Sequence, residues 1–521
     1  MQRVALFGAS GTMGFEAFRE LWRRRADYHL TVLLLPGDKR LNRFRPYARE
    51  TGLSWRPPRV AGAGPVVQDG EGLRIVWGDA RDPATARAIV DGCDHVLNAM
   101  AVIPPATDQQ PELARQVNDR AISHIIEAIR EEPDGDSRIT YVHTGSVAQT
   151  GSRPPGMHVG RVGDPLNPSV FDVYALTKIA GERRVLESGL HRWASLRMSF
   201  IMPSDHAQLL GLSDPLMFHM PPDTRFEAIS DRDAGYAMVQ CLLQPPGSGF
   251  WRRVWNIGGG PGMRYTASDY FSEIYSLFGL NWKDCTDRNW YALRNFHLQY
   301  YEDSSVANDF LQFWRDDRES FREALLGSMP APYRLLRWLV RHAPGAGSIA
   351  ERAARRQLQK LAERSPSSPR FWYLNDDGER LRAFFGSREA YEAIPGWDGA
   401  PPVNVDPDQP WQRLDHGYDE TKAVLDAGDL EQAAAFRGGR FLGPAFSGSP
   451  HEPLQWECAF GHRFTARPLT VLHAGHWCPT FTATWNGGIR AQRDRFFAQV
   501  WYADHSPDEL HEYGDPEHPA G

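Results

Sequence analysis

The stretch Ser169-Val-Phe-Asp-Val-Tyr-Ala-Leu-Thr-Lys-Ile-Ala-Gly-Glu182 places a tyrosine and a lysine four residues apart, with a glutamate four residues further on. On a helix this spacing aligns Tyr174, Lys178 and Glu182 along one face, where a phenol and an ammonium group can meet one ligand. A fixed cation beside a phenol favours the phenolate and lowers the phenol's pKa toward the range useful for proton transfer. A solvated helix face with a buried tyrosine is the alternative interpretation.

A glycine-rich turn near the N-terminus favours the catalytic interpretation. The apolar run that starts at Arg3 enters the turn Gly8-Ala-Ser-Gly-Thr-Met-Gly14, and a helical pattern follows over residues 15–25. Three glycines at this spacing allow a tight turn, close approach of the backbone to a pyrophosphate and close packing of helix on strand. The first N–H groups of the helix would then bind the phosphates.

Over about residues 2–280 the chain resembles the extended short-chain dehydrogenase/reductase family. This family includes the NAD-dependent epimerases and dehydratases. The family has the glycine motif G-x-x-G-x-x-G and a catalytic Ser or Thr, Tyr and Lys. The resemblance implies a Rossmann-type α/β fold, with a doubly wound parallel sheet and a smaller substrate-binding part. It also implies NAD or NADP as cofactor and a homodimer formed through the helices of the catalytic region.

The implied catalytic residues follow the fifth predicted strand, residues 139–151. Ser146 lies 28 residues before Tyr174 and would orient the substrate oxygen, while the tyrosine transfers the proton. Asn118, in the helix predicted over residues 116–129, would support the lysine, and an asparagine in mid-helix is otherwise unfavourable. Family dehydratases carry Thr-Asp-Glu where this chain has Ser146-Val-Ala148, so dehydratase chemistry is not expected. The catalytic set is Ser146, Tyr174, Lys178 and Asn118.

The cofactor contacts follow from the same resemblance. An acid in the loop after the predicted strand 30–35 binds the ribose of NAD, whereas a basic residue there accommodates the phosphate of NADP. This loop offers both kinds, so the choice stays open. Asp79 with Ala80 would reach the adenine, although Asp79 could instead cap the helix near Pro83. The full set is Gly8, Ser10, Gly11, Thr12, Met13, Gly14, Asp38, Lys39, Arg40, Asp79, Ala80, Asn98, Ala99, Met100, Ala101, Tyr174 and Lys178.

Composition restricts the class of protein. A chain of 521 residues is too long for one ordinary core, which predicts two or three domains. A hydrophobic content of 41% and a net charge of −7 describe a soluble globular protein and exclude a typical nucleic-acid binder. No apolar run approaches the ~20 residues that span a bilayer. Five scattered cysteines and an N-terminus that enters a strand at once, leaving no room for a signal peptide, favour a cytoplasmic enzyme.

The substrate region departs from sugar-nucleotide epimerases of the family, which usually place an arginine seven residues before the aspartate matching Asp233. Phe226 stands there, with Arg225 beside it. The residues that precede this position are apolar, which favours a hydrophobic, hydroxysteroid-like substrate, although plain core packing would also explain them. These residues are Pro215, Met217, Phe218, Met220 and Pro221.

The resemblance fades near residue 281, and residues 281–400 are expected to form a mostly helical extension. The aromatic stretch 282–313 could fold as a helical cap over the site. Residues 331–364 carry eight Lys or Arg against two Glu, and the segment 335–341 combines an apolar stripe with arginines. Such a segment either lies on a membrane surface or packs on its own domain with a solvated basic face. We expect the packed helix and no membrane partner. Residues 401–410 read as a linker.

The C-terminal region, residues 401–521, contains a second motif over about residues 450–485. Trp456-Glu-Cys-Ala-Phe-Gly-His462 and Trp477-Cys-Pro-Thr-Phe481 resemble a treble-clef or zinc-ribbon module of the form W-x-C-x-x-G-H and W-C-P-x-C. Cys458, His462 and Cys478 match zinc ligands, and thiolate and imidazole suit tetrahedral zinc. Phe481 replaces the fourth ligand. His476 or His473 could complete a structural site, or the metal was lost while the fold remained.

Three functions are compatible with these motifs. The leading hypothesis is an NAD(P)-dependent oxidoreductase that interconverts a secondary alcohol and a ketone on a small hydrophobic molecule. The second is a nucleotide-sugar epimerase with tightly bound NAD. The third is a sensor or scaffold that binds NAD(P) without turnover.

Overall fold

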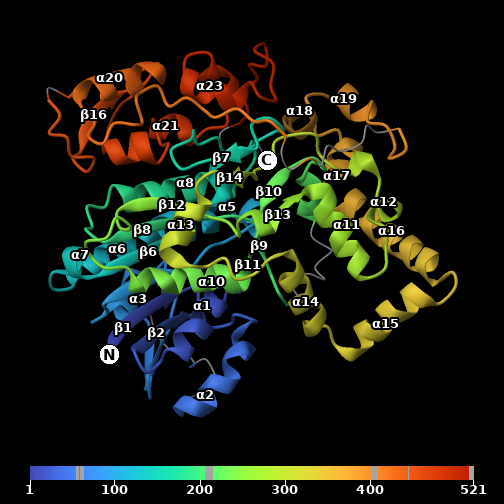
Figure 1. The fold of residues 1–521 in the computed structure, drawn as a ribbon, viewed down its shortest axis with the longest axis horizontal. Coiled ribbons are helices and arrows are strands. Elements are labelled where there is room, and N and C mark those ends of the chain that lie inside the picture. Colours follow the sequence, from blue (N-terminus) through green and yellow to red (C-terminus); the bar gives the residue numbers. More distant parts are fainter. Residues whose placement is uncertain are drawn as a thin grey trace.

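The main body of the protein is an eight-stranded sheet, seen in a computed structural model that describes residues 1–53, 58, 64–205, 215–399, 406, 409–443 and 445–514 (Figure 1). The strand order is β12-β8-β6-β5-β1-β2-β4-β3, and every neighbouring pair except β3 with β4 is parallel. The order reverses direction between β1 and β5, which confirms the predicted doubly wound Rossmann-type sheet. The strands are β1 (Gln2–Phe7), β2 (Tyr28–Leu34), β3 (Val66–Gly70), β4 (Leu73–Trp77), β5 (His95–Asn98), β6 (Thr140–Ser146), β8 (Trp193–Met198) and β12 (Arg253–Ile257).

One strand of the main sheet was not predicted from the sequence. β3 is a five-residue edge strand with only half-buried and exposed residues, and it pairs antiparallel with β4 across the turn Glu71-Gly72. Its signal was a two-residue connection ending in a glycine, and Gly72 has a φ of +71°. A short polar edge strand lacks the continuous apolar run that identified the others.

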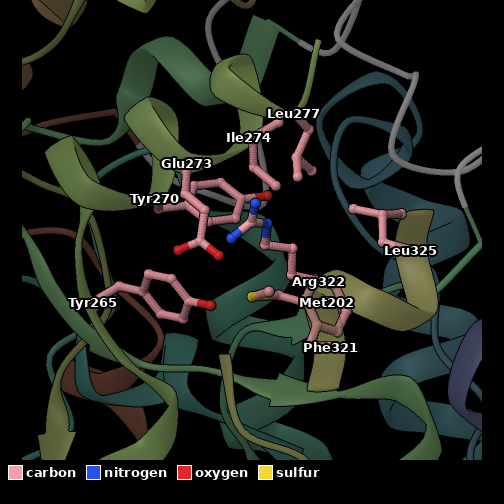
Figure 2. A pocket seen from close by; sticks show the side chains of 9 residues that line it. All are labelled: Met202, Tyr265, Tyr270, Glu273, Ile274, Leu277, Phe321, Arg322 and Leu325. Atoms are coloured by element: carbon pink, nitrogen blue, oxygen red, sulfur yellow. The ribbon is translucent and has the colours of Figure 1, made fainter. Parts of the chain in front are cut away.

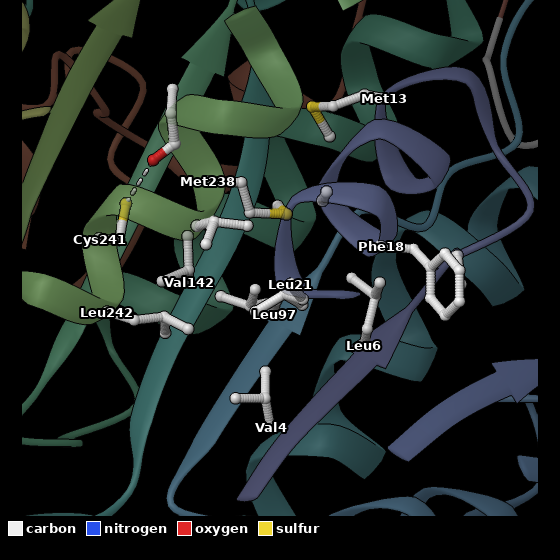
Figure 3. Close-up of a cluster of buried hydrophobic side chains, with 14 of the residues drawn as sticks. Val4, Leu6, Met13, Phe18, Leu21, Leu97, Val142, Met238, Cys241 and Leu242 are labelled. Carbon is white, nitrogen blue, oxygen red and sulfur yellow. Dashed lines mark hydrogen bonds between the residues drawn. The ribbon is translucent and has the colours of Figure 1, made fainter. Parts of the chain in front are cut away.

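Helices cover both faces of the sheet. α1 (Thr12–Arg23) and α10 (Asp231–Gln240) pack on one face, where Phe18, Leu21 and Met238 belong to one buried cluster over the central strands (Figure 3). In the register of the sheet, Leu6 lies between Val32 and Leu97. The opposite face is covered by α3 (Pro83–Val90), α6 (Ala121–Glu131) and α8 (Val173–Leu186). This layering exposes the carboxyl ends of the strands along one edge, where α/β sheets bind ligands.

A second part of the chain is built from short strand pairs and an aromatic core. The pairs are β7 (Val159–Gly160) with β14 (Tyr300–Tyr301), β9 (Ile201–Met202) with β11 (Ile229–Ser230), and β10 (Arg225–Glu227) with β13 (Arg264–Thr266). The expectation of a helical cap over residues 282–313 is wrong. Only α12 (Trp282–Cys285) and α13 (Ser304–Leu311) are α-helical there, and Trp282, Trp290 and Tyr291 are buried in the same aromatic cluster as residues of α11 (Ala267–Leu277).

The rest of the extension is helical, as expected. Among the described residues no helix is long and apolar enough to cross a membrane. α15 does not follow the expected packing, because none of its described residues is buried. The helices are α14 (Arg318–Ser328), α15 (Ala331–His342), α16 (Ala346–Arg364), α17 (Pro369–Leu374), α18 (Gly378–Phe385) and α19 (Arg388–Glu392).

The C-terminal region forms a separate layer that covers α8 (Figure 1). Its elements are α20 (Ala427–Phe436), α21 (Pro479–Thr482), α22 (Gly487–Ala491), α23 (Arg495–Trp501) and the three-stranded sheet of β15 (Arg440–Phe441), β16 (Leu454–Glu457) and β17 (Arg463–Ala466). Most of the linker predicted over residues 401–410 lies outside the described residues. Arg183 on α8 donates through Nη1 to the Trp477 carbonyl at 2.8 Å. This contact occupies part of a helix that the resemblance assigned to a dimer interface.

The close approach of α10 to α1 yields a stability prediction. A Cβ at Gly235 would lie 2.6 Å from the Ala17 nitrogen. We expect Gly235→Ala to destabilise the fold by about 1–3 kcal/mol through overpacking. Thermal and denaturant unfolding measure the change. Gly247→Ala is the matched control because nothing described lies within 4 Å of its Cβ position. Equal stability of both variants would contradict the prediction.

Candidate active site and metal cluster

The glycine-rich turn between β1 and α1 is a cradle that side chains would fill. A Cβ at Gly14 would lie 2.1 Å from the Gly8 carbonyl oxygen, and one at Gly8 would lie 2.7 Å from the Ala99 carbonyl carbon. Gly8 also has a φ of +75°. α1 begins without a side-chain cap and without an acid in its first turn, so its positive end is left for an anion. The cradle therefore fits a dinucleotide pyrophosphate.

The predicted ribose site is built around a carboxylate. Ser10 Oγ donates to Asp38 Oδ2 at 2.5 Å, and Arg40 donates to the same carboxylate through its backbone and side chain. Burial raises the pKa of Asp38, but these hydrogen bonds outweigh it and the pKa is lowered. Lys39 is exposed beside them. The acid thus lies against the glycine-rich turn, with Arg40 as its ion-pair partner.

The remaining predicted cofactor residues lie at the carboxyl edge of the sheet in differing roles. Asp79 accepts hydrogen bonds from Arg81, whereas Asp82 caps α3, so the alternative role of Asp79 as a cap is wrong. Ala80 is buried beside it. Asn98 uses its side chain to hold the turn, because its Oδ1 accepts from the Met100 nitrogen at 3.1 Å. The backbone of residues 99–101 is the part left to face a cofactor.

The catalytic candidates come together where β6 ends and α8 begins. The Ser146 side chain lies near the phenol of Tyr174 and lowers its pKa, and this tyrosine is half-buried in the first turn of α8. Asp172 caps this helix by accepting from the Ala175 nitrogen. Lys178 is buried, and its Nζ donates to the Thr144 carbonyl oxygen at 2.7 Å. One strand end therefore holds both the serine and the carbonyl that fixes the lysine.

The expectation that the lysine lowers the pKa of the tyrosine is wrong. Burial raises the pKa of Tyr174 to about 12, although the nearby Ser146 side chain lowers it. Lys178 Nζ lies 5.9 Å from the centroid of the tyrosine ring and bonds Thr144 instead. Burial also lowers the pKa of Lys178 to about 8. Desolvation of the phenol thus outweighs the charge of a lysine that is itself poorly solvated.

Asn118 lies in a single π-helical turn, residues 116–120, between α5 (Pro111–Arg115) and α6. Its amide exchanges two 2.8 Å hydrogen bonds with the backbone of Val102 and donates to Thr177 Oγ1 at 3.1 Å. It therefore joins the turn after β5 to α8, next to Lys178. The buried side chain thus has the structural reason that its mid-helix position demanded, and π-turns often mark functional sites.

A buried charge cluster that the sequence did not reveal lies one turn along α8. Glu182 accepts from Arg197 Nη2 at 2.6 Å, Ser195 Oγ at 2.7 Å and Gln149 Nε2 at 2.9 Å. Burial disfavours its charged form, but the Arg197 guanidinium and His476 outweigh it, so the pKa of Glu182 lies well below its ordinary value. The sequence signal was the i+4 glutamate, and only the fold identifies its partners.

His476 belongs to this cluster and not to the metal site for which we predicted it. Its Nε2 lies 3.0 Å from Glu182 Oε2, and its ring is fully buried. Burial lowers the pKa of His476 to about 4, so the neutral ring donates to the carboxylate. The Ala474 carbonyl beside it accepts from Arg197 Nη2 at 2.7 Å. The loop before the second zinc-like knuckle therefore completes the charge cluster beneath the catalytic helix.

The other three predicted metal ligands do converge. The ligand atoms of Cys458, His462 and Cys478 lie within 4.8 Å of one another, and Cys478 Sγ is 3.5 Å from His462 Nδ1. Burial and the neighbouring Cys478 raise the pKa of the Cys458 thiol, a cost that a bound cation would reverse. Phe481, at the fourth ligand position, stacks on Phe460 with ring centroids 4.0 Å apart. The three residues fit zinc, with the fourth position lacking a protein ligand.

The apolar residues of the predicted substrate region lie in the core, and a separate hollow lies away from the catalytic candidates. Phe226, Phe218 and Met220 are buried in the aromatic core, so core packing explains them. A small hollow between α11 and α14 is lined by Tyr265, Glu273, Arg322 and neighbouring apolar residues (Figure 2). None of the predicted catalytic residues lines it. Phe226, Phe218 and Met220 therefore no longer support a hydrophobic substrate.

The charge cluster generates a stability prediction. Glu182→Gln keeps the shape of the side chain but leaves Arg197 buried without a counter-charge, so we expect a loss of about 3–5 kcal/mol. Denaturant unfolding measures it. The control is Glu112→Gln, whose ion pair with Arg120 is more than half exposed on both sides and should change stability by less than about 1 kcal/mol. Similar losses in both variants would contradict the buried-pair assignment.

The metal cluster generates a second prediction. Protein purified with zinc present should retain about one zinc ion per chain after dialysis, and Cys478→Ser should lose most of it because one of three ligands is removed. Elemental analysis measures the zinc content. Cys93→Ser is the control, since Cys93 is buried elsewhere with its thiol on the Ile89 carbonyl. A wild-type chain without zinc would overturn the assignment.

Comparison with known proteins found similar solved structures but no matching family. No protein-family model and no curated relative matches the chain. UDP-glucuronic acid 4-epimerase from Bacillus cereus, in complex with UDP-glucuronic acid and NAD, is 16% identical over 65% of this chain and 100% of its own, with a TM-score of 0.46. DesIV, a dTDP-glucose 4,6-dehydratase from Streptomyces venezuelae with NAD bound, is 18% identical over 66% of this chain and 98% of its own, with a TM-score of 0.47. The chain is similar to these two NAD-bound structures over about two thirds of its length.

Proposed function

We propose that the protein is an NAD-linked oxidoreductase that interconverts a secondary alcohol and a ketone. The observation that carries the proposal is the convergence of Ser146, Tyr174 and Lys178 at the carboxyl edge of a Rossmann-type sheet. The glycine cradle lies at the same edge, because β1 and β6 flank β5. A nucleotide cofactor on that cradle would end near the catalytic phenol.

The roles of the side chains follow from their contacts. The nicotinamide, when bound, supplies or accepts the hydride. The Ser146 hydroxyl, which lies near the phenol, holds the substrate oxygen, and Tyr174 exchanges a proton with that oxygen. Lys178 spends one of its three N–H donors on Thr144 and keeps two for the cofactor ribose. With a pKa of about 8 it is mostly charged at neutral pH and loses its charge as the pH rises above that value.

The ribose site supports NAD over NADP. The Asp38 carboxylate faces the glycine-rich turn through Ser10 and would accept a hydrogen bond from a free ribose hydroxyl. A 2′-phosphate would meet this negative charge. Arg40, the basic residue that could offset it, is already paired with Asp38. The same carboxylate therefore favours the cofactor without the phosphate.

A nucleotide-sugar epimerase is the second candidate, because it would use the same three residues and return the hydride to the opposite face of the sugar. Arg225, which neighbours the position where epimerases place their diphosphate arginine, is buried and donates to the Asp406 carbonyl at 3.1 Å. This contact directs the guanidinium toward the protein's own chain. It favours net oxidation or reduction over epimerisation, while the hydroxysteroid-like substrate remains a hypothesis.

The test is turnover of NADH and NADPH against ketones, steroids and nucleotide sugars, followed by absorbance. We expect oxidation of NADH by a ketone, and a loss of about 10²–10⁴-fold in kcat for Tyr174→Phe because proton transfer is removed. Cofactor binding, followed by fluorescence, should survive. Tyr502→Phe is the control, a half-buried tyrosine at the end of α23.

Two results would overturn the proposal. Full activity of Tyr174→Phe would remove the tyrosine from the reaction. Interconversion of a nucleotide sugar, with no net change of cofactor, would establish the epimerase instead.

A further inference from the structure

The helix α15 exposes the side chains that helices usually bury. Leu335, Leu336 and Trp338 are 59%, 56% and 56% exposed, and Leu339 is 41% exposed. At 100° per residue these four side chains share one broad side of the helix. Isolated exposed leucines are common on protein surfaces, but a continuous apolar side on one helix indicates an interaction.

The polar side of α15 is the one that faces the protein. Arg337 Nε donates to the Leu277 carbonyl oxygen at the end of α11, at 2.6 Å. The stem of Arg341 lies against Gly279, where a Cβ would be 2.7 Å from Arg341 Cγ. A surface helix that packs on its own domain turns its apolar stripe inward. In α15 this order is inverted, so the expectation of a packed helix with a solvated basic face is wrong.

The surroundings of the apolar side are basic. Between Ala331 and Arg364 the chain carries a net charge of +6, although the whole chain carries −7. No acid occurs on α15, and Arg334, Arg352 and Arg356 are exposed. Ile349, at the start of α16, adds a further apolar side chain that is 62% exposed. The α15–α16 hairpin lies at the outer edge of the molecule, and no labelled element lies beyond it (Figure 1).

We propose that α15 and the first turns of α16 bind an anionic lipid surface, with α15 lying in the plane of the membrane interface. Leucine and tryptophan on one side of a helix, with arginines at the margins, is the composition of interfacial helices. The apolar side would enter the acyl boundary, and the exposed Arg334, Arg352 and Arg356 would contact the lipid phosphates. The protein would thus be held at a membrane without crossing it.

A second copy of the chain is a poorer occupant of this surface. In a twofold dimer the same surface meets itself, so two α15 helices would bring their arginines together. No acid on α15 could pair with them. An anionic bilayer satisfies both the apolar side chains and the positive charge.

The test is sedimentation of the full-length protein with phosphatidylcholine vesicles, with and without about 30 mol% phosphatidylserine. We expect binding to the phosphatidylserine vesicles that weakens as salt is added. Leu335→Glu with Leu336→Glu should reduce the partition coefficient at least about tenfold, since both leucines leave the interface. Arg334→Gln and Arg352→Gln should each weaken binding about fivefold. α15 has no buried residue and Arg352 on α16 is exposed, so these variants should keep the wild-type unfolding midpoint.

The matched control is Leu374→Glu with Val424→Glu, two side chains that are 49% and 72% exposed outside the hairpin. It should bind vesicles like the wild type. Three results would overturn the proposal: no binding of the wild type to phosphatidylserine vesicles, equal loss in the control, or self-association abolished by the leucine variant without any vesicle binding. The last result would assign the surface to a second copy.

Discussion

The buried carboxylate of Glu182 is the interaction on which the organisation of this protein depends. It joins β8, the catalytic helix and the C-terminal region through Arg197, Ser195 and His476. A buried carboxylate is tolerated only where charge and hydrogen bonds surround it on every side. The C-terminal region therefore supports the helix that carries the candidate catalytic residues, because without its histidine and the Ala474 carbonyl the cluster would lack two of its partners.

The candidate catalytic residues are also positioned by buried polar contacts. Thr144 and Ser146 lie at the end of one strand. The Thr144 carbonyl accepts from the lysine of the adjoining helix, and Ser146 lies near its tyrosine. Asn118 connects that helix to the turn after β5. Backbone carbonyls and neutral side chains thus place the reactive groups before any ligand arrives, which is the preorganisation that proton transfer requires.

The surroundings of Glu182 and of α15 have opposite character. Around Glu182 the chain turns charged groups inward and satisfies them, and at α15 it turns apolar groups outward with no described residue covering them. The first arrangement stabilises a single structure. The second raises the cost of exposure to water, which a lipid surface would remove.

Much of the fold could be predicted from the sequence, because the determining signals are local. The glycine spacing at residues 8–14 requires a tight turn between a strand and a helix, and the apolar runs that follow have the length of buried parallel strands. The i, i+4 spacing of Tyr174 and Lys178 likewise holds wherever a helix forms. These features depend on the few residues around them. The succession of the main strands along the chain and the catalytic candidates could therefore be predicted from the sequence.

Only the tertiary structure decided which partners those residues meet. Glu182 and His476 are 294 positions apart, and no local pattern distinguishes a histidine that serves a carboxylate from one that binds zinc. The pKa of Tyr174 is raised, not lowered, because burial depends on the whole fold. The amphipathic pattern of residues 335–341 was visible in the sequence, but its direction was not, since a periodicity defines a side of a helix and only packing shows which way that side faces.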